Sequence, residues 1–433
     1  IPDEMGGQGP AAATVTLSQL EYRLANAIYK MTRAKAPVVA MVAPKEAVSI
    51  DPQMREIYRQ MGQPIPESED PYEMLQQILE YEKYEVRRVE LTKESPMPEE
   101  YDTLVVVNPR SLNDRQRWEI NRALVGGKPV VLAVQNYEWD YQVTRDGIRF
   151  SRREEKPEIN SLLDNYGLKV SDDILMDKNS VTLTVQGGGG LAGLMGQPVP
   201  SPTHIMVANA SMAQSSSITN RLSSILYLWG TALSLDDAKL KSAGLSADVI
   251  MKTSNDAWSV AKDTPLTQAS FEKPATGAQA YPLMALVSGQ FPDAFKDKER
   301  PAWPKAAPKQ PGMPPQPEEP DTEGPAKAVE AKPGKLVLLG CSELFRKNFL
   351  QAGNLDLFLN AVDAVSLDDT LVQVRNRKPI DRIIEKPEDN VKTLWRLANY
   401  GLANILIAGI GVSSFVLRRR ARNAYTLAQS KVG

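Results

Sequence analysis

The chain has 433 residues, 42% of them apolar, which is enough length and apolar content to build more than one hydrophobic core. Its 51 basic and 53 acidic side chains leave a net charge of −2, so no basic field exists to hold nucleic acid. One cysteine, Cys341, excludes an internal disulfide, and one histidine, His204, excludes the usual histidine-based metal sites. We expect a folded protein without a cofactor, a metal ion or a nucleic-acid partner.

The first part of the chain alternates predicted helices and strands. Helices are predicted at 16–33, at 70–84 with Asp70 as N-cap, and from Asn113 to residue 122; strands are predicted at 38–42, 86–91, 104–107 and 130–134. The strands are short, nearly continuous apolar runs, which is typical of strands that are buried on both faces. This order predicts an α/β fold, with an open, mostly parallel sheet flanked by helices.

A proline-rich segment interrupts the later part. Strand-like runs occur at 205–208, 247–252 and 283–287, before ten prolines that fall between Pro301 and Pro333. This composition buries too little apolar surface to order itself. A strand at 336–339 and a helix at 354–365 then resume. We therefore expect one folded body at 1–297, a disordered insertion at 298–334, and completion of the same body at 335–390.

The stretch from Leu397 to Leu417 runs for 21 residues without a charge. At about 1.5 Å per residue, a helix of that length covers the roughly 30 Å of bilayer hydrocarbon, so we expect a transmembrane helix at 397–417. Its small residues would let helices of a partner approach closely. The alternative is a buried core helix with a solvated basic end.

Positive charge predicts how this helix is oriented. It is followed at once by four arginines, Arg418, Arg419, Arg420 and Arg422. Lysine and arginine next to a spanning helix are retained in the cytoplasm, so residues 418–433 are expected to be cytoplasmic and the folded body extracytoplasmic. The chain begins at Ile1 without a methionine, and we expect a first membrane helix upstream that exports the body.

Two further features are candidates for chemical sites. The run Gly187, Gly188, Gly189 and Gly190 lacks the Gly-Lys-Ser/Thr ending of a phosphate-binding loop, so it is interpreted as a flexible surface loop. Leu191 and Leu194 make it a possible contact for a partner. His204 and Cys341 are the only candidates for a nucleophilic pair, but Cys341 lacks a glycine-flanked elbow and is predicted to be a small buried residue.

Several segments resemble the auxiliary domain of GldG-type ABC transporter proteins. The matching segments, in the order in which the family has them, are 20–33 (LEYRLANAIYKMTR), 84–91, 97–106 (MPEEYDTLVV), 126–131 (GGKPVV) and 353–363 (GNLDLFLNAVD). The terminal helix with its arginine cluster also lies where the family has one. One departure is Cys341-Ser342-Glu343-Leu344-Phe345, where the family usually has an acidic Asp-Ser-Asp/Glu-Phe run.

The resemblance implies a non-catalytic, membrane-anchored accessory subunit of an ABC transporter in the bacterial inner membrane, with its bulk in the periplasm. The implied partners are a multispan permease, a separate cytoplasmic ATPase, and an envelope protein or polysaccharide cargo, with a link to export and gliding motility. An alternative is a protein that binds a carbohydrate or lipid-linked ligand near Asn108, Gln135 or Ser342, at the carboxyl ends of the strands. A further alternative is a structural component of a membrane machine.

Overall fold

The computed structural model describes residues 35–47, 52–62, 68–144, 147–185, 197–264, 268–304, 328–366, 395, 398, 407–420 and 422. It divides into two compact units, Ile1–Pro379 and Ile380–Gly433, and each is described by itself. The predicted helix at 16–33 lies outside the described residues.

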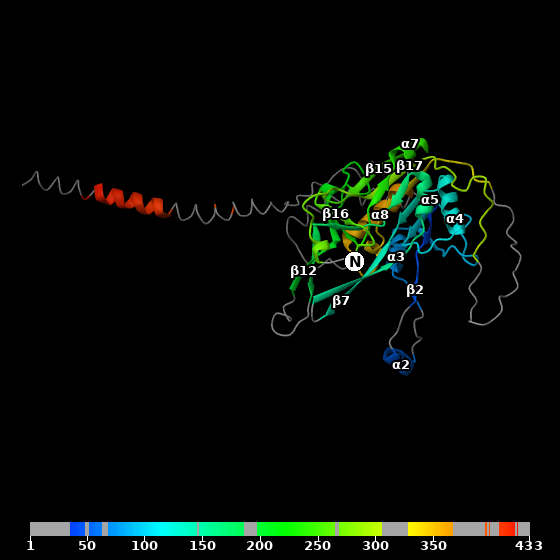
Figure 1. The fold of residues 1–433 in the computed structure, drawn as a ribbon, viewed down its shortest axis with the longest axis horizontal. Coiled ribbons are helices and arrows are strands. Elements are labelled where there is room, and N and C mark those ends of the chain that lie inside the picture. Colours follow the sequence, from blue (N-terminus) through cyan, green and yellow to red (C-terminus); the bar gives the residue numbers. More distant parts are fainter. Residues whose placement is uncertain are drawn as a thin grey trace, which may run out of the picture. The chain divides into compact units, whose positions relative to one another are not determined.

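A seven-stranded sheet forms the centre of the first unit (Figure 1). Its order is β15 (Leu245–Lys252), β17 (Pro282–Gly289), β18 (Gly334–Leu339), β6 (Val130–Ala133), β5 (Thr103–Val107), β1 (Val38–Val42) and β4 (Glu85–Arg88). The pairs from β18 to β4 are all parallel, and β17 is antiparallel to both of its neighbours. The predicted α/β fold with a mostly parallel sheet is therefore confirmed.

The five parallel strands follow a doubly wound order. Numbered along the chain, β1, β4, β5, β6 and β18 lie in the spatial order 2-1-3-4-5, which is the order of flavodoxin-like sheets. The chain leaves β1 toward β4 and then returns to the other side of β1 to form β5. The direction of winding thus reverses between β1 and β5. In such sheets, ligands bind outside the carboxyl ends of the strands at this point.

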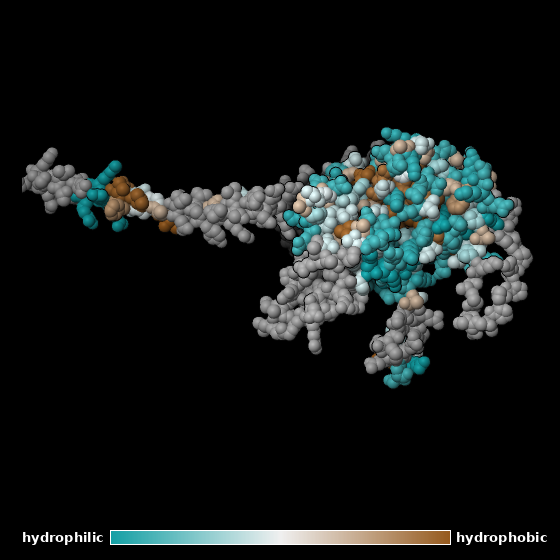
Figure 2. All heavy atoms as spheres, viewed as in Figure 1, coloured by the Kyte–Doolittle hydropathy of each residue, from teal (hydrophilic) through white to brown (hydrophobic). Residues whose placement is uncertain are grey.

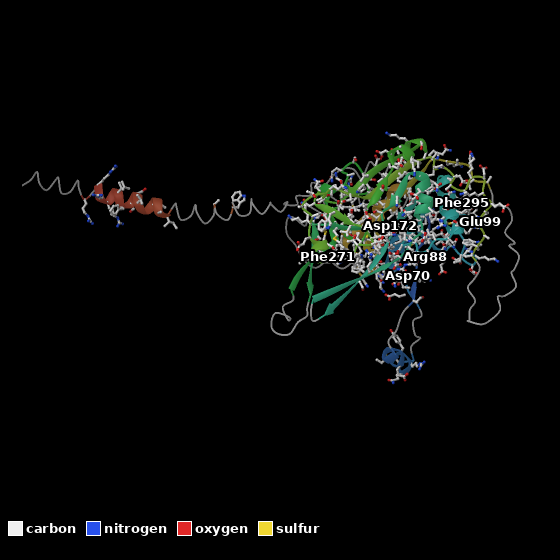
Figure 3. The ribbon with its side chains drawn as sticks, viewed as in Figure 1. Asp70, Arg88, Glu99, Asp172, Phe271 and Phe295 are labelled. Carbon is white, nitrogen blue, oxygen red and sulfur yellow. The ribbon has the colours of Figure 1, made fainter. Side chains whose placement is uncertain are left out.

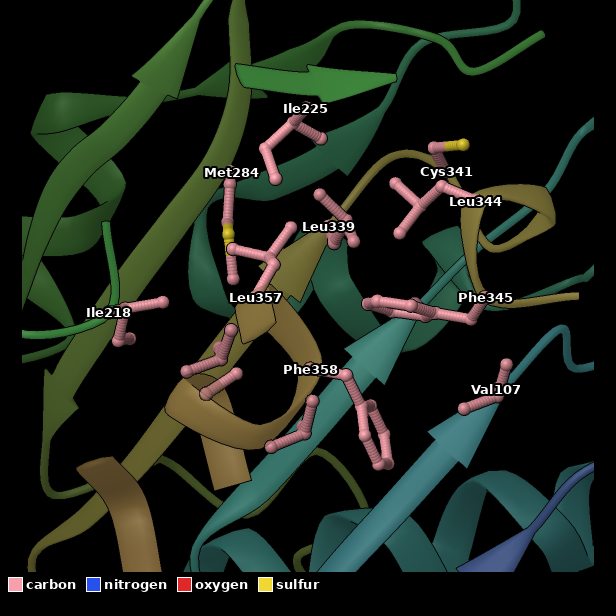
Figure 4. Packing of buried hydrophobic residues seen from close by; sticks show 14 of the residues in the cluster. Val107, Ile218, Ile225, Met284, Leu339, Cys341, Leu344, Phe345, Leu357 and Phe358 are labelled. Atoms are coloured by element: carbon pink, nitrogen blue, oxygen red, sulfur yellow. The ribbon is translucent and has the colours of Figure 1, made fainter. Parts of the chain in front are cut away.

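Helices cover both faces of the sheet, because alternate strand residues point to opposite sides. On one face, α3 (Glu73–Tyr81) and α8 (Ala352–Ser366) contribute Leu79 and Phe358 to a core cluster with Val105 and Leu339 of the sheet. Figure 4 shows Phe358 and Leu339 in this cluster. On the other face, α4 (Asp114–Val125) and α5 (Asn160–Leu163) bury side chains against Leu104 and Leu132. The sheet is thus sandwiched between two helical layers.

Two predicted helix starts have different outcomes. The predicted helix start at Asn113 is confirmed, and Asn113 is the N-cap of α4: its side chain accepts from the Gln116 N–H at 3.0 Å, and the Gln116 side chain accepts from the Asn113 N–H at 3.0 Å. The prediction of Asp70 as N-cap is wrong, because α3 begins at Glu73 after Tyr72. Asp70 instead accepts from the Tyr72 N–H and pairs with Arg88 at 2.9 Å (Figure 3).

Smaller strands surround the main sheet. A hairpin is formed by β7 (Tyr137–Thr144) and β8 (Gly147–Glu154), and a short arm by β2 (Glu46–Ala47) and β3 (Ser68–Glu69), with α2 (Pro52–Gln60) between β2 and β3. The other pairings are β9 (Leu168–Val170) with β14 (Leu233–Leu235), β10 (Ile174–Asp177) with β16 (Ala257–Val260), and β12 (Gln197–Ala208) with both β11 (Ser180–Val185) and β13 (Ser224–Leu228). Short 3-10 helices, of which η4 (Glu343–Phe345) matters most here, complete the unit.

The described ends of the proline-rich segment contact α4. At one end the Arg115 guanidinium lies between the rings of Trp118 and Trp303, 4.8 and 4.5 Å from their centroids. At the other end the Lys332 N–H donates to the Val125 carbonyl at 2.9 Å. Strand β18 follows directly and pairs with both β17 and β6, so the segment leaves and re-enters a single sheet.

In the second unit, residues 407–420 are helical. Their large apolar side chains are exposed, Ile407 by 69% and Phe415 by 65%, and Figure 2 shows apolar side chains on this helix. No helix within the described residues has both the length and the apolar character needed to cross a membrane. Leu397 and most of the first half of the predicted span lie outside the described residues.

Candidate functional site

Polar side chains gather at the carboxyl ends of the parallel strands. Asn108 follows β5 directly, Gln135 is the second residue after β6, and Ser342 and Glu343 follow β18. Tyr72 joins them from the turn before α3. All five are at most 1% exposed, and Asn108 stands beside the point where the winding of the sheet reverses. We call Tyr72, Asn108, Ser342 and Glu343 the polar cluster.

Gln135 has a structural role. Its amide nitrogen donates to the Tyr137 and Trp229 carbonyls at 2.8 and 3.0 Å. Its amide oxygen accepts from the backbone N–H groups of Ser342 and Glu343, at 2.9 and 3.3 Å. A fully bonded buried amide of this kind fixes the relative positions of the loops that it joins. Gln135 thus holds the end of β6 against the end of β18.

The polar cluster is not bonded in this way. Within the described part of the chain, the Tyr72 hydroxyl, both amide atoms of Asn108, the Ser342 hydroxyl and Glu343 Oε2 have no partner with hydrogen-bond geometry. The Tyr72 hydroxyl lies near Ser342 and Asn108, which lower its pKa, but burial is the larger effect and raises that pKa above its usual range. The cluster therefore consists of an uncharged phenol, an alcohol and an amide that lie close to one another, with the Glu343 carboxyl beside them.

An ion-pair network adjoins the polar cluster through Glu343. Its members are three arginines and four glutamates: Arg110, Arg153, Arg346, Glu46, Glu138, Glu155 and Glu343. Glu46 bridges two of the arginines, with distances of 2.8 Å to Arg110 and 2.6 Å to Arg346. Glu46 belongs to β2 and Glu138 to β7, so the network ties the arm and the hairpin to the strand ends.

Glu343 connects the network to the polar cluster. Its Oε1 lies 3.6 Å from Arg346 Nη1, while Oε2 is unpartnered among the described residues. Burial raises the pKa of Glu343 from 4.5 to about 7, and Arg346 opposes this shift. The carboxyl therefore changes its protonation state near neutral pH.

This pKa predicts a pH-dependent stability. Because the pKa of Glu343 is raised on folding, its carboxyl costs no stability below about pH 4.5, where it is protonated in both the folded and the unfolded chain. The free energy of unfolding falls as pH rises from 4.5 to about 7, because the folded chain must then bury a charge. Replacing Glu343→Gln is expected to raise the free energy of unfolding relative to wild type by up to about 3 kcal/mol at pH 8 and by little at pH 4.5. Denaturant titrations at both pH values measure this difference. The exposed Glu100→Gln serves as control, and an equal effect of Glu343→Gln at both pH values would contradict the prediction.

The candidate pair of Cys341 and His204 is not arranged for nucleophilic chemistry. The Cys341 thiol is fully buried and donates to the Leu228 carbonyl at 3.1 Å, and burial raises its pKa to about 12. His204 Nε2 accepts from the Trp229 ring N–H at 2.8 Å, and burial lowers the pKa of His204 to about 4. At neutral pH the thiol is protonated and the imidazole is neutral. The interpretation of Cys341 as a buried small residue is confirmed.

The other predicted site residues lie elsewhere. The loop of Gly187, Gly188, Gly189 and Gly190, with Leu191 and Leu194, lies outside the described residues. Of the anchor residues, Leu417, Arg418, Arg419, Arg420 and Arg422 are described, in the second unit. The sequence reasoning pointed to Asn108 and Ser342 from their positions after strands, but it missed Tyr72 and the arginines. No local sequence pattern marks Arg346 as part of this site, because its partners are up to 300 residues away along the chain.

Fold and site together define a doubly wound α/β unit with buried polar side chains at its switch point and, within its described residues, without a phosphate-binding glycine loop. The sequence profile of one family matches residues 37–361, which is most of the chain. The chain belongs to this family of ABC transporter auxiliary proteins, described as "ABC-type uncharacterized transport system". Membership implies association with an ABC transporter complex in an accessory role.

No curated protein matches the chain. Among solved structures, an N-terminal domain described as mmIFT52 is similar at 12% identity, over 77% of this chain and 98% of that chain, with a TM-score of 0.39. A putative ThuA-like protein from Bacteroides uniformis is similar at 10% identity, over 77% of this chain and 94% of that chain, with a TM-score of 0.34.

Proposed function

We propose that this chain is a non-catalytic accessory subunit of an ABC transporter, anchored in the bacterial inner membrane by a helix at 397–417. The observation that carries the accessory role is the family match over residues 37–361. In this proposal a separate cytoplasmic subunit hydrolyses ATP and a multispan permease forms the pathway. The resemblance to GldG-type proteins supports a role in export or gliding motility, with an envelope protein or polysaccharide as cargo.

The described helix of the second unit supports the anchor. Ile410, Val412 and Leu417 are exposed by 69%, 63% and 65%, in a helix that also contains Arg418, Arg419 and Arg420. Each apolar side chain kept in water forgoes about 1.5–3 kcal/mol of burial free energy, so lipid or partner helices are the favourable surroundings. The arginines favour a cytoplasmic end at residues 418–433 and a periplasmic first unit.

Truncation tests the anchor. Deleting residues 397–433 is expected to release the chain from the membrane fraction and to remove it from the detergent-purified transporter complex, as measured by fractionation and mass spectrometry of co-purifying subunits. The matched control deletes only residues 421–433, which leaves the apolar helix and Arg418 to Arg420 in place. A complex that keeps its composition without residues 397–433 would show that the anchor does not hold the subunit.

A further inference from the structure

Basic charge is concentrated in the last part of the chain. From Asn390 to Gly433 the sequence contains seven of the 51 lysines and arginines and none of the 53 aspartates and glutamates. The net charge of the whole chain is −2, so the residues before Asn390 are net acidic. A basic segment on an otherwise acidic chain indicates an interaction with an anionic surface.

Three consecutive arginines, Arg418, Arg419 and Arg420, lie in the described helix at 407–420, and all three are exposed. Successive residues of an α-helix are rotated by about 100° around its axis, so the three side chains leave the helix in three different directions. Figure 2 shows hydrophilic side chains beside the apolar ones on this helix. Contact with a partner on one side of the helix would therefore leave a guanidinium facing elsewhere.

The sequence around these arginines contains no acidic side chain that could neutralise them. Ion pairs on a helix surface join residues three or four positions apart. Those positions are residues 414–417 before the arginines and 421–424 after them, which are Ser, Phe, Val, Leu, Ala, Arg, Asn and Ala. The positive charge is therefore left to be balanced by groups outside this helix.

The neighbouring side chains indicate what kind of surface surrounds the arginines. Phe415, Val416 and Leu417 directly precede Arg418 and are exposed by 65%, 40% and 65%. They too leave the helix in three directions, so the change from apolar to basic occurs all round the axis. A protein partner covers one side of a helix, whereas a lipid leaflet surrounds it, with acyl chains next to apolar residues and phosphates next to basic ones.

We propose that Arg418, Arg419 and Arg420 bind the phosphate groups of anionic lipids, such as phosphatidylglycerol, around this helix. The inference rests on the membrane anchor proposed above. Guanidinium groups form bidentate hydrogen bonds with phosphate, and a lipid without a cationic headgroup leaves the phosphate charge uncompensated. The attraction weakens as salt is added, since the Debye length falls from about 10 Å at 0.1 M to about 3 Å at 1 M.

The test measures lipid preference with the full chain reconstituted in phosphatidylcholine vesicles that contain either spin-labelled phosphatidylglycerol or spin-labelled phosphatidylcholine. Electron paramagnetic resonance gives the relative affinity of the two lipids for the protein. We expect a preference of about threefold or more for phosphatidylglycerol at low salt. At about 1 M salt the ratio is expected to approach one.

Variants separate the charge of the arginines from the rest of the chain. Replacing Arg418→Gln, Arg419→Gln and Arg420→Gln together is expected to abolish the preference. Replacing the same residues by Arg418→Lys, Arg419→Lys and Arg420→Lys keeps most of it, because the charges remain. The matched control removes three exposed positive charges from the first unit, by Lys169→Gln, Lys239→Gln and Lys241→Gln, and is expected to keep the wild-type ratio.

Flotation with pure phosphatidylcholine vesicles measures the anchor separately. A chain that floats with them but shows no lipid preference contradicts this inference and leaves the anchor standing. A chain that floats only with vesicles containing phosphatidylglycerol supports the contact between arginines and anionic lipid, and contradicts the anchor. The inference is also overturned if the preference persists at about 1 M salt, if the glutamine variant keeps the wild-type ratio, or if the lysine control loses the preference equally.

Discussion

Replacing Gly340→Ala is expected to destabilise the first unit by about 3 kcal/mol or more. A Cβ on Gly340 would lie 2.3 Å from the Thr231 carbonyl oxygen and 2.7 Å from the Tyr227 hydroxyl. Neither group can retreat easily, because the Tyr227 hydroxyl donates to that same carbonyl at 2.7 Å and the Thr231 N–H donates to the Gly340 carbonyl at 2.8 Å. The close approach of two backbones at the end of β18 therefore requires glycine.

Denaturant unfolding of the purified variant measures this loss. Gly244→Ala is the matched control, because a Cβ there meets nothing within 4 Å and only the φ of +70° is unfavourable. Its expected cost is about 1 kcal/mol. If Gly340→Ala cost no more than Gly244→Ala, the packing of β18 against the loop at Thr231 would be looser than described.

Replacing Phe358→Ala is expected to cost about 3–5 kcal/mol of unfolding free energy. Phe358 of α8 is fully buried, and its ring meets the Phe345 ring edge-on with centroids 5.3 Å apart (Figure 4). Removing it leaves a cavity between the helix and the sheet, next to η4, which carries Glu343. We expect the loss of stability to be accompanied by loosening of the strand ends that form the polar cluster.

Chemical denaturation together with hydrogen exchange of the backbone amides at residues 341–345 checks both parts of this prediction. Tyr81→Ala, at an aromatic side chain that is 68% exposed, is expected to change stability by less than about 0.5 kcal/mol. A Phe358→Ala protein as stable as Tyr81→Ala would mean that α8 does not close the core.

Local patterns predicted most of the main sheet. The runs of β1, β5, β6 and β18 were predicted within two residues of their observed bounds, because strands buried on both faces must be continuously apolar. The start of α4 was visible because its N-cap is satisfied by residues three positions away. The start of α3 was not predicted correctly, because the Asp70 side chain pairs with Arg88 instead of capping the helix. Arg88 belongs to a strand that lies next to Asp70 only in the folded chain.

The candidate site, like the fold, was predictable only where local sequence determines it. Residues that follow strands are recognisable in a sequence, and Asn108 and Ser342 were predicted as possible ligand contacts for that reason. Whether their polar atoms are bonded depends on neighbours far along the chain, as for Gln135, which bonds to Ser342 across 207 positions. The ion-pair network was unforeseeable for the same reason, since mixed charge runs such as 152–156 also occur on ordinary solvated surfaces.

The sequence by itself determined that this protein has an α/β fold with a mostly parallel sheet, since the period and apolar character of its strands are local properties. It also carried the resemblance to ABC transporter auxiliary proteins. Only the tertiary structure decided the strand order, the reversal between β1 and β5, and which polar side chains are buried together there. The physical reason is that hydrogen bonding, burial and ion pairing are set by distances in space, and the segments that meet at this site are far apart in the chain.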